Sequence, residues 1–186
     1  SDVGQAREVL LAVEIPEQPG SFLRFCEALG SRAVTEFNYR FGAKASAQIF
    51  VGFAVTRGKE ERDEVIATLR GAGYGVTDMT DNEMAKLHVR YMVGGHVNGS
   101  VAHEKLFRFE FPERKGALLK FLQAVGSRWN ITLFHYRNHG SDYGRVLAGI
   151  DVPPSDAGDF LDHLNVLHFS YSDETNNPAY RIFLGS

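Results

Sequence analysis

The sequence predicts an α+β fold in which two ferredoxin-like subdomains, each with the element order βαββαβ, pack together. A segment near the N-terminus recurs in the second half of the chain, which indicates an internal duplication. Around each copy, strand-like and helix-like patterns alternate in the same order, as in a split βαβ unit. At 186 residues the chain is long enough to bury a core in two such subdomains.

The repeat can be followed residue by residue. VEIPEQPGSFLRFCEALGSRAVTEFNYRF (13–41) aligns with FEFPERKGALLKFLQAVGSRWNITLFHYRN (109–138), with one inserted residue after the shared Gly-Ser-Arg triplet. Matching positions are Pro16 and Pro112, Glu17 and Glu113, Gly20 and Gly116, Phe22 and Leu118, Phe25 and Phe121, Arg32 and Arg128, Tyr39 and Tyr136, and Arg40 and Arg137. Identities spread over the whole stretch indicate duplication rather than chance, and the long period indicates subdomains rather than a solenoid.

The first copy contains the patterns of four strands and two helices. Apolar residues alternate with polar ones in the strands. In the first helix they recur at i, i+3, i+4 and i+7, as Phe22, Phe25, Cys26 and Leu29. That helix is expected to end at Gly30, since glycine tolerates the left-handed conformation that often follows a helix. The expected strands are 10–15, 34–41, 47–55 and 74–79, and the second helix is 59–73.

The second copy repeats these patterns. Its first helix carries Leu118, Phe121, Leu122 and Val125 at the same spacing and is expected to end at Gly126. The expected strands are 105–111, 131–136, 146–152 and 169–172, and the second helix is 155–165.

The two subdomains are expected to span residues 8–95 and 103–186, with 96–102 as a short connection. Apolar residues alternate over 87–95 as in a further strand, and the GGHVNGS stretch that follows is the best linker candidate. Because the alternating segment leaves little sequence suited only to a solvated linker, we expect the subdomains to pack against each other.

Composition narrows the class of protein. The formal net charge of −3 gives no general reason to expect nucleic acid or an anionic membrane as partner. The apolar runs are too short for a membrane span, and the first residues do not resemble a signal peptide. The chain does not begin with Met, which suggests a segment of a longer protein. The single cysteine, Cys26, lies in an apolar helical stripe, which favours a packed thiol in a reducing compartment.

The sequence shows no catalytic or metal-binding constellation. His135 and His139 have the spacing of two helical zinc ligands, but they lie in a predicted strand and turn without a third ligand. DETNN at 173–177 begins like a calcium loop but lacks its glycine and its closing glutamate, so it is interpreted as an Asx-rich turn. No lysine lies in a loop suited to a cofactor phosphate, and no nucleophile elbow occurs. These observations favour small-ligand sensing.

Longer stretches resemble a known family. EIPEQPGSFLRFCEALGSRAVTEFNYRF, DNEMAKLHVRYMVGG, FEFPERKGALLKFL, WNITLFHYRNHGSDYGRVLAGIDV and DETNNPAYRIFL are similar to the C-terminal regulatory region of biosynthetic threonine deaminase (threonine ammonia-lyase, threonine dehydratase). The resemblance covers residues 9–184. It departs from the family near the C-terminus, where NVLHFSYSDETNN replaces a Gly-Tyr-rich strand start, so the register of the last strand is open.

The resemblance implies two ACT-like subdomains that bind isoleucine as feedback inhibitor and valine as a counteracting effector. It implies that this chain has no cofactor of its own. Pyridoxal phosphate would belong to a catalytic domain of the same polypeptide, which converts threonine to 2-oxobutanoate and ammonia. It further implies a homo-oligomer located in the cytoplasm, or in the plastid stroma of a plant.

The resemblance also implies effector-binding residues. These are the repeated Tyr39 and Tyr136, together with Phe22, Arg32, Arg40, Glu113, Leu118, Leu122 and Arg137. The chemistry is compatible, since an amino acid needs an apolar pocket for its side chain and polar groups for its charges. We expect the ligand between the first helix of a subdomain and the strand ending in Tyr-Arg, with its carboxylate facing the helix start. Replacing either tyrosine by alanine is expected to weaken binding and leave the melting temperature nearly unchanged.

Alternatives stay open at this point. The tyrosines could simply be core residues, and each arginine could pair with a nearby glutamate. The chain could also be a stand-alone ACT-like sensor that acts on another protein. A small ferredoxin-like enzyme with His135 or His139 as general base is the third possibility.

Overall fold

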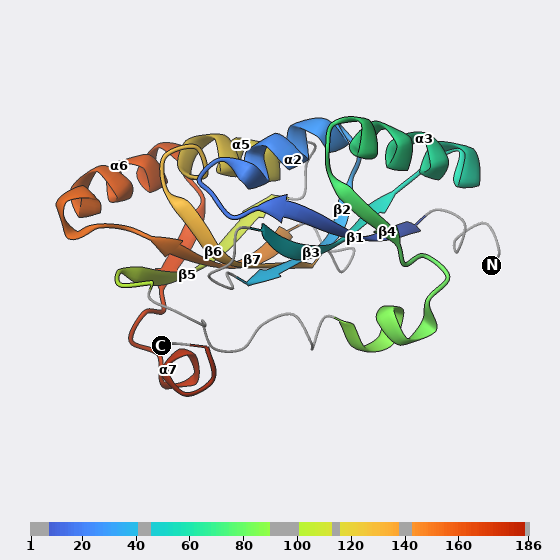
Figure 1. Ribbon diagram of the computed structural model, residues 1–186. Helices are drawn as coiled ribbons and strands as arrows, with labels where there is room; N and C mark the ends of the chain where they lie inside the picture. The colour runs from blue at the N-terminus through green and yellow to red at the C-terminus, as the bar shows by residue number, and fades with distance from the viewer. Residues whose placement is uncertain (1–7, 41–45, 90–100, 113–115, 138–142, 185–186) are drawn as a thin grey trace.

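The structure is a computed structural model that describes residues 8–40, 46–89, 101–112, 116–137 and 143–184. Within these residues, the strands form one eight-stranded antiparallel sheet in the order β4-β1-β3-β2-β6-β7-β5-β8 (Figure 1). The first half contains β1 (Glu8–Pro16), α2 (Ser21–Leu29), β2 (Val34–Arg40), β3 (Ser46–Ala54), α3 (Gly58–Gly71), β4 (Gly75–Asp78) and the π-helical η1 (Ala85–Val89). The second half contains β5 (Glu104–Pro112), α5 (Ala117–Val125), β6 (Asn130–Arg137), β7 (Tyr143–Asp151), the 3-10 turn η2 (Pro154–Asp156), α6 (Ala157–Leu167), β8 (Ser170–Asp173) and α7 (Pro178–Phe183).

The strand order is that of two ferredoxin-like units. β4-β1-β3-β2 repeats in reverse direction as β6-β7-β5-β8, and each unit has the element order βαββαβ. The predicted α+β class with two ACT-like units is therefore confirmed. The units join edge to edge, because β2 pairs with β6 and makes their two sheets continuous.

The β2–β6 pairing is related by a local twofold axis. Phe37 lies opposite Tyr136, and Tyr39 lies opposite Phe134. Each of these pairs is the repeat image of the other, and the axis passes between Asn38 and His135, which face each other. The sequence had not indicated that the last strand residues of the two repeats would meet at the centre of the molecule.

Four helices, α2, α3, α5 and α6, cover one face of the sheet (Figure 1). Their apolar stripes and the sheet residues beneath them form one core that runs through both units. Each unit's first helix starts after a glycine with φ 84°, Gly20 or Gly116. α2 ends, as expected, at Gly30, whose positive φ of 80° favours glycine, although its ψ of −151° is not that of a left-handed helix. α5 also ends where expected, at Gly126, but this glycine is right-handed with φ −77°, and an added Cβ would lie 2.9 Å from the Leu122 carbonyl oxygen.

Two further expectations need correction. The alternating segment 87–95 is not a strand in its described part, because residues 87–89 belong to the π-helix η1, and residues 90–95 lie outside the described residues. The Asn82 side chain starts this helical segment by accepting the Ala85 amide hydrogen at 3.0 Å. β8 also begins one residue later than expected, at Ser170.

η1 and α7 lie on the face of the sheet opposite the four helices (Figure 1). α7 was not foreseen. It begins at Pro178, and Asn177 of the predicted Asx-rich turn caps it by accepting the Ala179 amide hydrogen at 2.8 Å. Among the described residues, no helix has the length and apolar character that crossing a membrane requires.

Candidate effector site

Tyr39 and Phe22 meet beneath the start of α2. Their ring centroids are 4.5 Å apart with the planes at 75°, an edge-to-face contact. Both side chains belong to the core, since Tyr39 is 1% exposed and Phe22 5%. The Tyr39 hydroxyl is hydrogen-bonded to Glu17, in the connection between β1 and α2. Burial, followed by the negative charge of Glu17, raises the pKa of Tyr39, so the hydroxyl stays protonated and donates to the carboxylate.

The start of α2 is suited to a carboxylate. Gly20 occupies the N-cap position in a left-handed conformation, and no side chain caps the helix. A helix start without a side-chain cap directs amide hydrogens and the positive end of the helix dipole outward. The nearby Arg24 adds positive charge and bonds to the buried Ser21 hydroxyl at 3.3 Å. Anionic and cationic groups therefore flank one short connection, Glu17 on one side and the helix start on the other.

The second unit repeats this arrangement as far as it is described. α5 also starts after a left-handed glycine, Gly116, without a side-chain cap. Tyr136 and Leu122 are buried, at 4% and 1% exposure, while Leu118 is half-buried against the same core. Glu113, the counterpart of Glu17, lies outside the described residues.

The two tyrosines belong to one aromatic layer between the sheet and the helices α2 and α5. Phe134, directly opposite Tyr39, is 6.1 Å from Phe22 and 5.6 Å from Phe37, measured between ring centroids. Phe37 in turn lies opposite Tyr136. The two candidate positions are therefore neighbours across the seam between the units, and a change at one tyrosine can reach the other through two rings.

Arg40 lies on the other face of the sheet. Its guanidinium forms hydrogen bonds to both oxygens of Glu104, at 2.9 and 3.1 Å, and to the Leu184 carbonyl. Tyr180 of α7 donates to the same carboxylate at 2.7 Å, and burial together with this bond raises the pKa of Tyr180. The Arg40 and Glu104 side chains are 4% and 5% exposed, so this is a buried ion pair.

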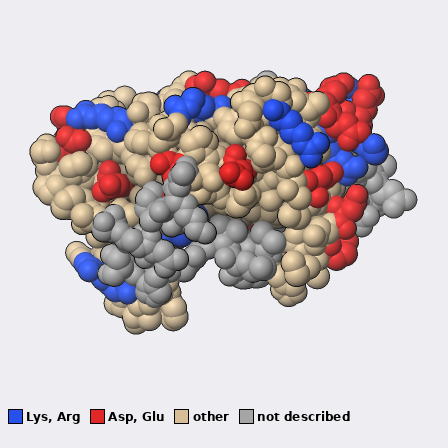
Figure 2. Space-filling view, viewed as in Figure 1, with Lys and Arg blue, Asp and Glu red and all other residues tan. Residues whose placement is uncertain are grey.

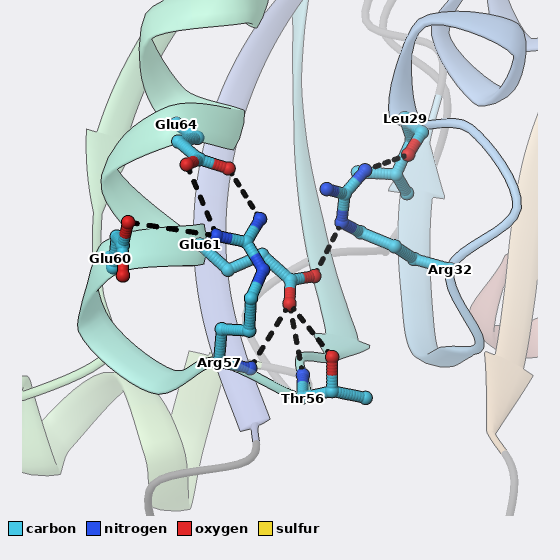
Figure 3. Close-up of polar contacts among 7 residues, drawn as sticks. All are labelled: Leu29, Arg32, Thr56, Arg57, Glu60, Glu61 and Glu64. Atoms are coloured by element: carbon cyan, nitrogen blue, oxygen red, sulfur yellow. Dashed lines mark hydrogen bonds and ion pairs between the residues drawn. The ribbon is translucent and has the colours of Figure 1, made fainter.

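Arg32 pairs with a glutamate of the neighbouring helix (Figure 3). Its Nε donates to Glu61 at 2.8 Å, and its Nη1 donates to the Leu29 carbonyl at 3.1 Å. Glu61 also accepts the amide hydrogens of Thr56 and Arg57, at 3.0 and 3.2 Å. These bonds, led by that of the Thr56 amide, lower the pKa of Glu61 to about 2. Arg32 therefore joins the end of α2 to the start of α3.

Arg128, the repeat counterpart of Arg32, makes the same kind of contact. It pairs with Asp159 at 2.9 Å and with Asp156 at 3.5 Å, at the start of α6. Arg137 ends β6 opposite Glu36 and is exposed. The structure thus brings Phe22 together with Tyr39 and places Leu122 and Tyr136 in the same buried core, but it places the arginines elsewhere.

Glu17 was not among the residues expected at the site. The repeat could have indicated it, since Glu17 aligns with Glu113 and each of the two precedes its helix-starting glycine by the same number of residues.

On the surface viewed in Figure 2, acidic and basic side chains intermix and gather most densely at the α3 end. This face therefore offers nucleic acid no continuous basic track. Among the described residues, no group of three or more His, Cys, Asp or Glu side chains could hold a metal ion.

Comparison with known proteins adds a family and relatives. Residues 1–89 and 96–184 match the family model described as the C-terminal regulatory domain of threonine dehydratase. The chain is 56% identical over 183 residues to L-threonine dehydratase biosynthetic IlvA of Escherichia coli, covering 98% of this chain and 35% of that protein. It is 42% identical to the mitochondrial threonine dehydratase of Saccharomyces cerevisiae, covering 98% and 33%, and 39% identical to the chloroplastic threonine dehydratase 1 biosynthetic of Solanum lycopersicum, covering 99% and 30%.

The chain therefore spans about a third of the length of these curated relatives. Among solved structures, it is similar to the regulatory subunit of aspartate kinase from Thermus thermophilus, with 16% identity and a TM-score of 0.35. That alignment covers 88% of this chain and 93% of the other.

Proposed function

Since this chain belongs to the family of C-terminal regulatory domains of threonine dehydratase, we propose that it is the allosteric sensor of a biosynthetic threonine dehydratase. It binds isoleucine as a feedback inhibitor and valine as a counteracting effector. The longer protein carries a catalytic domain that converts L-threonine to 2-oxobutanoate and ammonia. Pyridoxal phosphate, the electron sink for that chemistry, belongs to the catalytic domain, and this chain holds no cofactor.

One observation carries the proposal. The ring of Tyr39 lies beneath an uncapped helix start, with Phe22 at its edge and the Glu17 carboxylate on its hydroxyl. These groups match an aliphatic amino acid: the helix start takes the carboxylate, Glu17 takes the ammonium group, and the rings take the side chain. The repeat supplies a second such place at Tyr136, with Leu118 and Leu122 as the apolar wall.

Binding at this site requires movement. Phe22 and Tyr39 fill the space beneath the helix, so the ligand enters only when the connection 16–20 moves away from the tyrosine. The Tyr39–Glu17 hydrogen bond is then exchanged for bonds to the ligand. A ligand that favours this opened state over the closed one shifts the balance between them, which is what an allosteric effector must do.

The proposed limits of the two sensing units are residues 8–95 and 103–186, connected by 96–102. The longer protein is a homo-oligomer of the cytoplasm or, in a plant, of the plastid stroma.

Isoleucine differs from valine by one methylene, worth about 1–3 kcal/mol in an apolar pocket. Each unit is therefore expected to favour one over the other by no more than about two hundredfold.

Calorimetric titration of the purified chain with L-isoleucine, L-valine and D-isoleucine tests the proposal. We expect saturable binding of the two L-amino acids and none of D-isoleucine, because the helix start and Glu17 set the positions of carboxylate and ammonium. Absence of binding by both L-amino acids would overturn the proposed function. Equal binding of D-isoleucine would overturn the assignment of the site.

A further inference from the structure

Each ferredoxin-like unit is followed by the same additional element, a polar hook and a short helix. The hooks are 78–82 after β4 and 173–177 after β8, with the related sequences Asp-Met-Thr-Asp-Asn and Asp-Glu-Thr-Asn-Asn. In both, the aspartate accepts the amide hydrogen of the threonine at 2.9 Å. In both, the threonine hydroxyl accepts an amide hydrogen from the unit's first strand, from Leu10 at 3.2 Å or from Leu106 at 3.0 Å.

The helices after the two hooks present matching apolar side chains to solvent. Ala85 in the first helix and Tyr180 in the second are both buried. Each lies three residues after the last asparagine of its hook. Two residues further along, Leu87 is 60% exposed and Ile182 62%. Of the seven strongly exposed large apolar side chains in the described residues, four lie on these two short segments: Met84, Leu87, Ile182 and Phe183. We call these four residues the tail patch.

Both halves of the tail patch lie on the side of the sheet opposite α2, α3, α5 and α6 (Figure 1). In Figure 2, the projection formed by α7 is mostly uncharged, with basic atoms on one side and no acidic ones. Leu87 and Ile182 occupy repeat-equivalent positions, and Met84 and Phe183 add one further exposed apolar side chain to each helix. The two helices lie apart on this side of the sheet (Figure 1), so one partner that covers both exposed groups must be large enough to span them.

The tail patch is connected to the effector site through the sheet. α7 is held by the Tyr180–Glu104 bond of 2.7 Å, and Arg40 binds both Glu104 and the Leu184 carbonyl at the end of α7. Arg40 directly follows Tyr39 in β2, so its position depends on the same stretch of backbone. A displacement of Tyr39 therefore acts directly, through the β2 backbone, on Arg40, whose bonds hold α7 in place.

We propose that the tail patch is the docking surface for the N-terminal, catalytic part of the same polypeptide, and that this contact transmits effector binding. The inference rests on the proposed function. The relatives are about three times as long as this chain, and the family is described as a C-terminal domain. The rest of each relative therefore precedes the domain that this chain matches. The start of β1 lies beside the first hook, since Glu8 and Val9 line one small pocket with Thr80 and Asp81.

The start of β1 therefore lies close to the first hook, and Met84 follows that hook by two residues. Covalent connection gives the preceding part of the polypeptide a high effective concentration at the tail patch, so even a modest apolar contact suffices for docking. A second copy of this chain lacks that advantage, and it is treated below as a competing outcome.

Amide hydrogen exchange tests the docking surface directly. The amides of 83–89 and 178–184 are compared between the 186-residue chain and the full-length protein, both without isoleucine. We expect slower exchange in the full-length protein at both segments and unchanged exchange in α6, which carries exposed Leu161 and Val166 as a matched apolar control. Equal exchange in the two proteins overturns the proposal. This comparison does not depend on effector binding, so it separates failure of the docking surface from failure of the proposed function.

The second test is functional. In the full-length protein, Ile182→Glu combined with Phe183→Glu is expected to raise the isoleucine concentration for half-inhibition of threonine deamination about fivefold or more. The same pair of changes in the 186-residue chain should leave isoleucine affinity unchanged. Leu161→Glu combined with Val166→Glu should alter neither quantity. If the Ile182→Glu, Phe183→Glu variant is inhibited as the parent protein is, the transmitting role is overturned. If this variant forms a smaller oligomer while inhibition is unchanged, the role is also overturned, and the tail patch is assigned to contact with a second copy.

Discussion

Tyr39 and Arg40 are consecutive residues whose side chains lie on opposite faces of the sheet. Tyr39 packs against Phe22 of α2, whereas Arg40 is bonded to Glu104 beside α7. Alternation along a strand requires this separation. The repeated Tyr-Arg dipeptide therefore does not form one binding site. In the first unit, the tyrosine faces the candidate effector site, and the arginine faces the element that we assign to transmission.

Tyr39→Phe is the sharpest test of the first effector position. The change removes the hydroxyl that bonds to Glu17 and keeps the ring against Phe22. We expect a stability loss of about 1 kcal/mol and isoleucine binding about tenfold weaker, measured by thermal unfolding and calorimetry. Unchanged affinity in both this variant and Tyr136→Phe would show that the tyrosines are only core residues.

Tyr39→Ala is a poor test, contrary to the expectation from sequence that it leaves the melting temperature nearly unchanged. The ring is 1% exposed, and its removal leaves a cavity in the aromatic layer. A loss of about 3–5 kcal/mol is typical for such a truncation. Urea unfolding of this variant beside Tyr39→Phe checks the difference.

Arg40→Met is expected to lower the free energy of unfolding by about 3–5 kcal/mol, because it leaves the Glu104 carboxylate buried without its cation. Adding Glu104→Leu removes the isolated charge, so the double variant should recover a large part of the loss. Urea titrations of the two single variants and the double variant give the coupling energy. Additive losses would show that Arg40 and Glu104 do not depend on each other.

The Glu61 carboxylate should make stability depend on pH. Its pKa is lowered from 4.5 to about 2, so the native state favours the ionised form. The stabilisation is present at pH values above 4.5 and is lost as the pH falls toward 2. Glu61→Gln should therefore lower the melting temperature most near neutral pH, with a difference that shrinks through this window. Glu60→Gln is the control, since the Glu60 side chain is 76% exposed. A difference independent of pH would contradict the ionic role.

β2 and β6 each contain a bulge, where the pairing register shifts between Val34 and Glu36 and between Ile131 and Leu133. A methyl group added to the glycine beside each bulge should be poorly tolerated. An added Cβ would lie 2.7 Å from the Thr35 hydroxyl at Gly52, and 2.9 Å from the Thr132 hydroxyl at Gly149. Gly52→Ala and Gly149→Ala should each cost about 1–3 kcal/mol in unfolding free energy, because backbone or side chains must shift. Adding Thr35→Ala to Gly52→Ala should recover part of the lost unfolding free energy, because it removes the hydroxyl that the new methyl group would meet. Gly158 lies in a helix with open space around it, so Gly158→Ala should instead raise the free energy of unfolding by about 0.5–1 kcal/mol. Equal effects at Gly52 and Gly158 would refute this reading of the bulge.

Much of each unit was predictable because its signals are local. Period-2 alternation located the long strands, and the stripes containing Phe25 and Phe121 identified the faces of α2 and α5 that are buried. The repeat located Gly20 and Gly116 at equivalent helix starts. The prediction failed where two patterns overlap: the alternating residues 87–89 form a π-helical turn, because the Asn82 side chain caps a helix there.

The sequence by itself determined the duplicated unit, its element order, the buried face of each helix and the repeated tyrosines, since these depend on residue types at short spacing. Only the tertiary structure decided that β2 pairs with β6. Pairing of edge strands uses backbone N–H and C=O groups, which every strand offers, so side-chain patterns do not specify the partner. The same pairing decided that Tyr39 lies opposite Phe134. The ion pair of Arg40 with Glu104, a residue 64 positions away in the chain, likewise depends on how the two units meet.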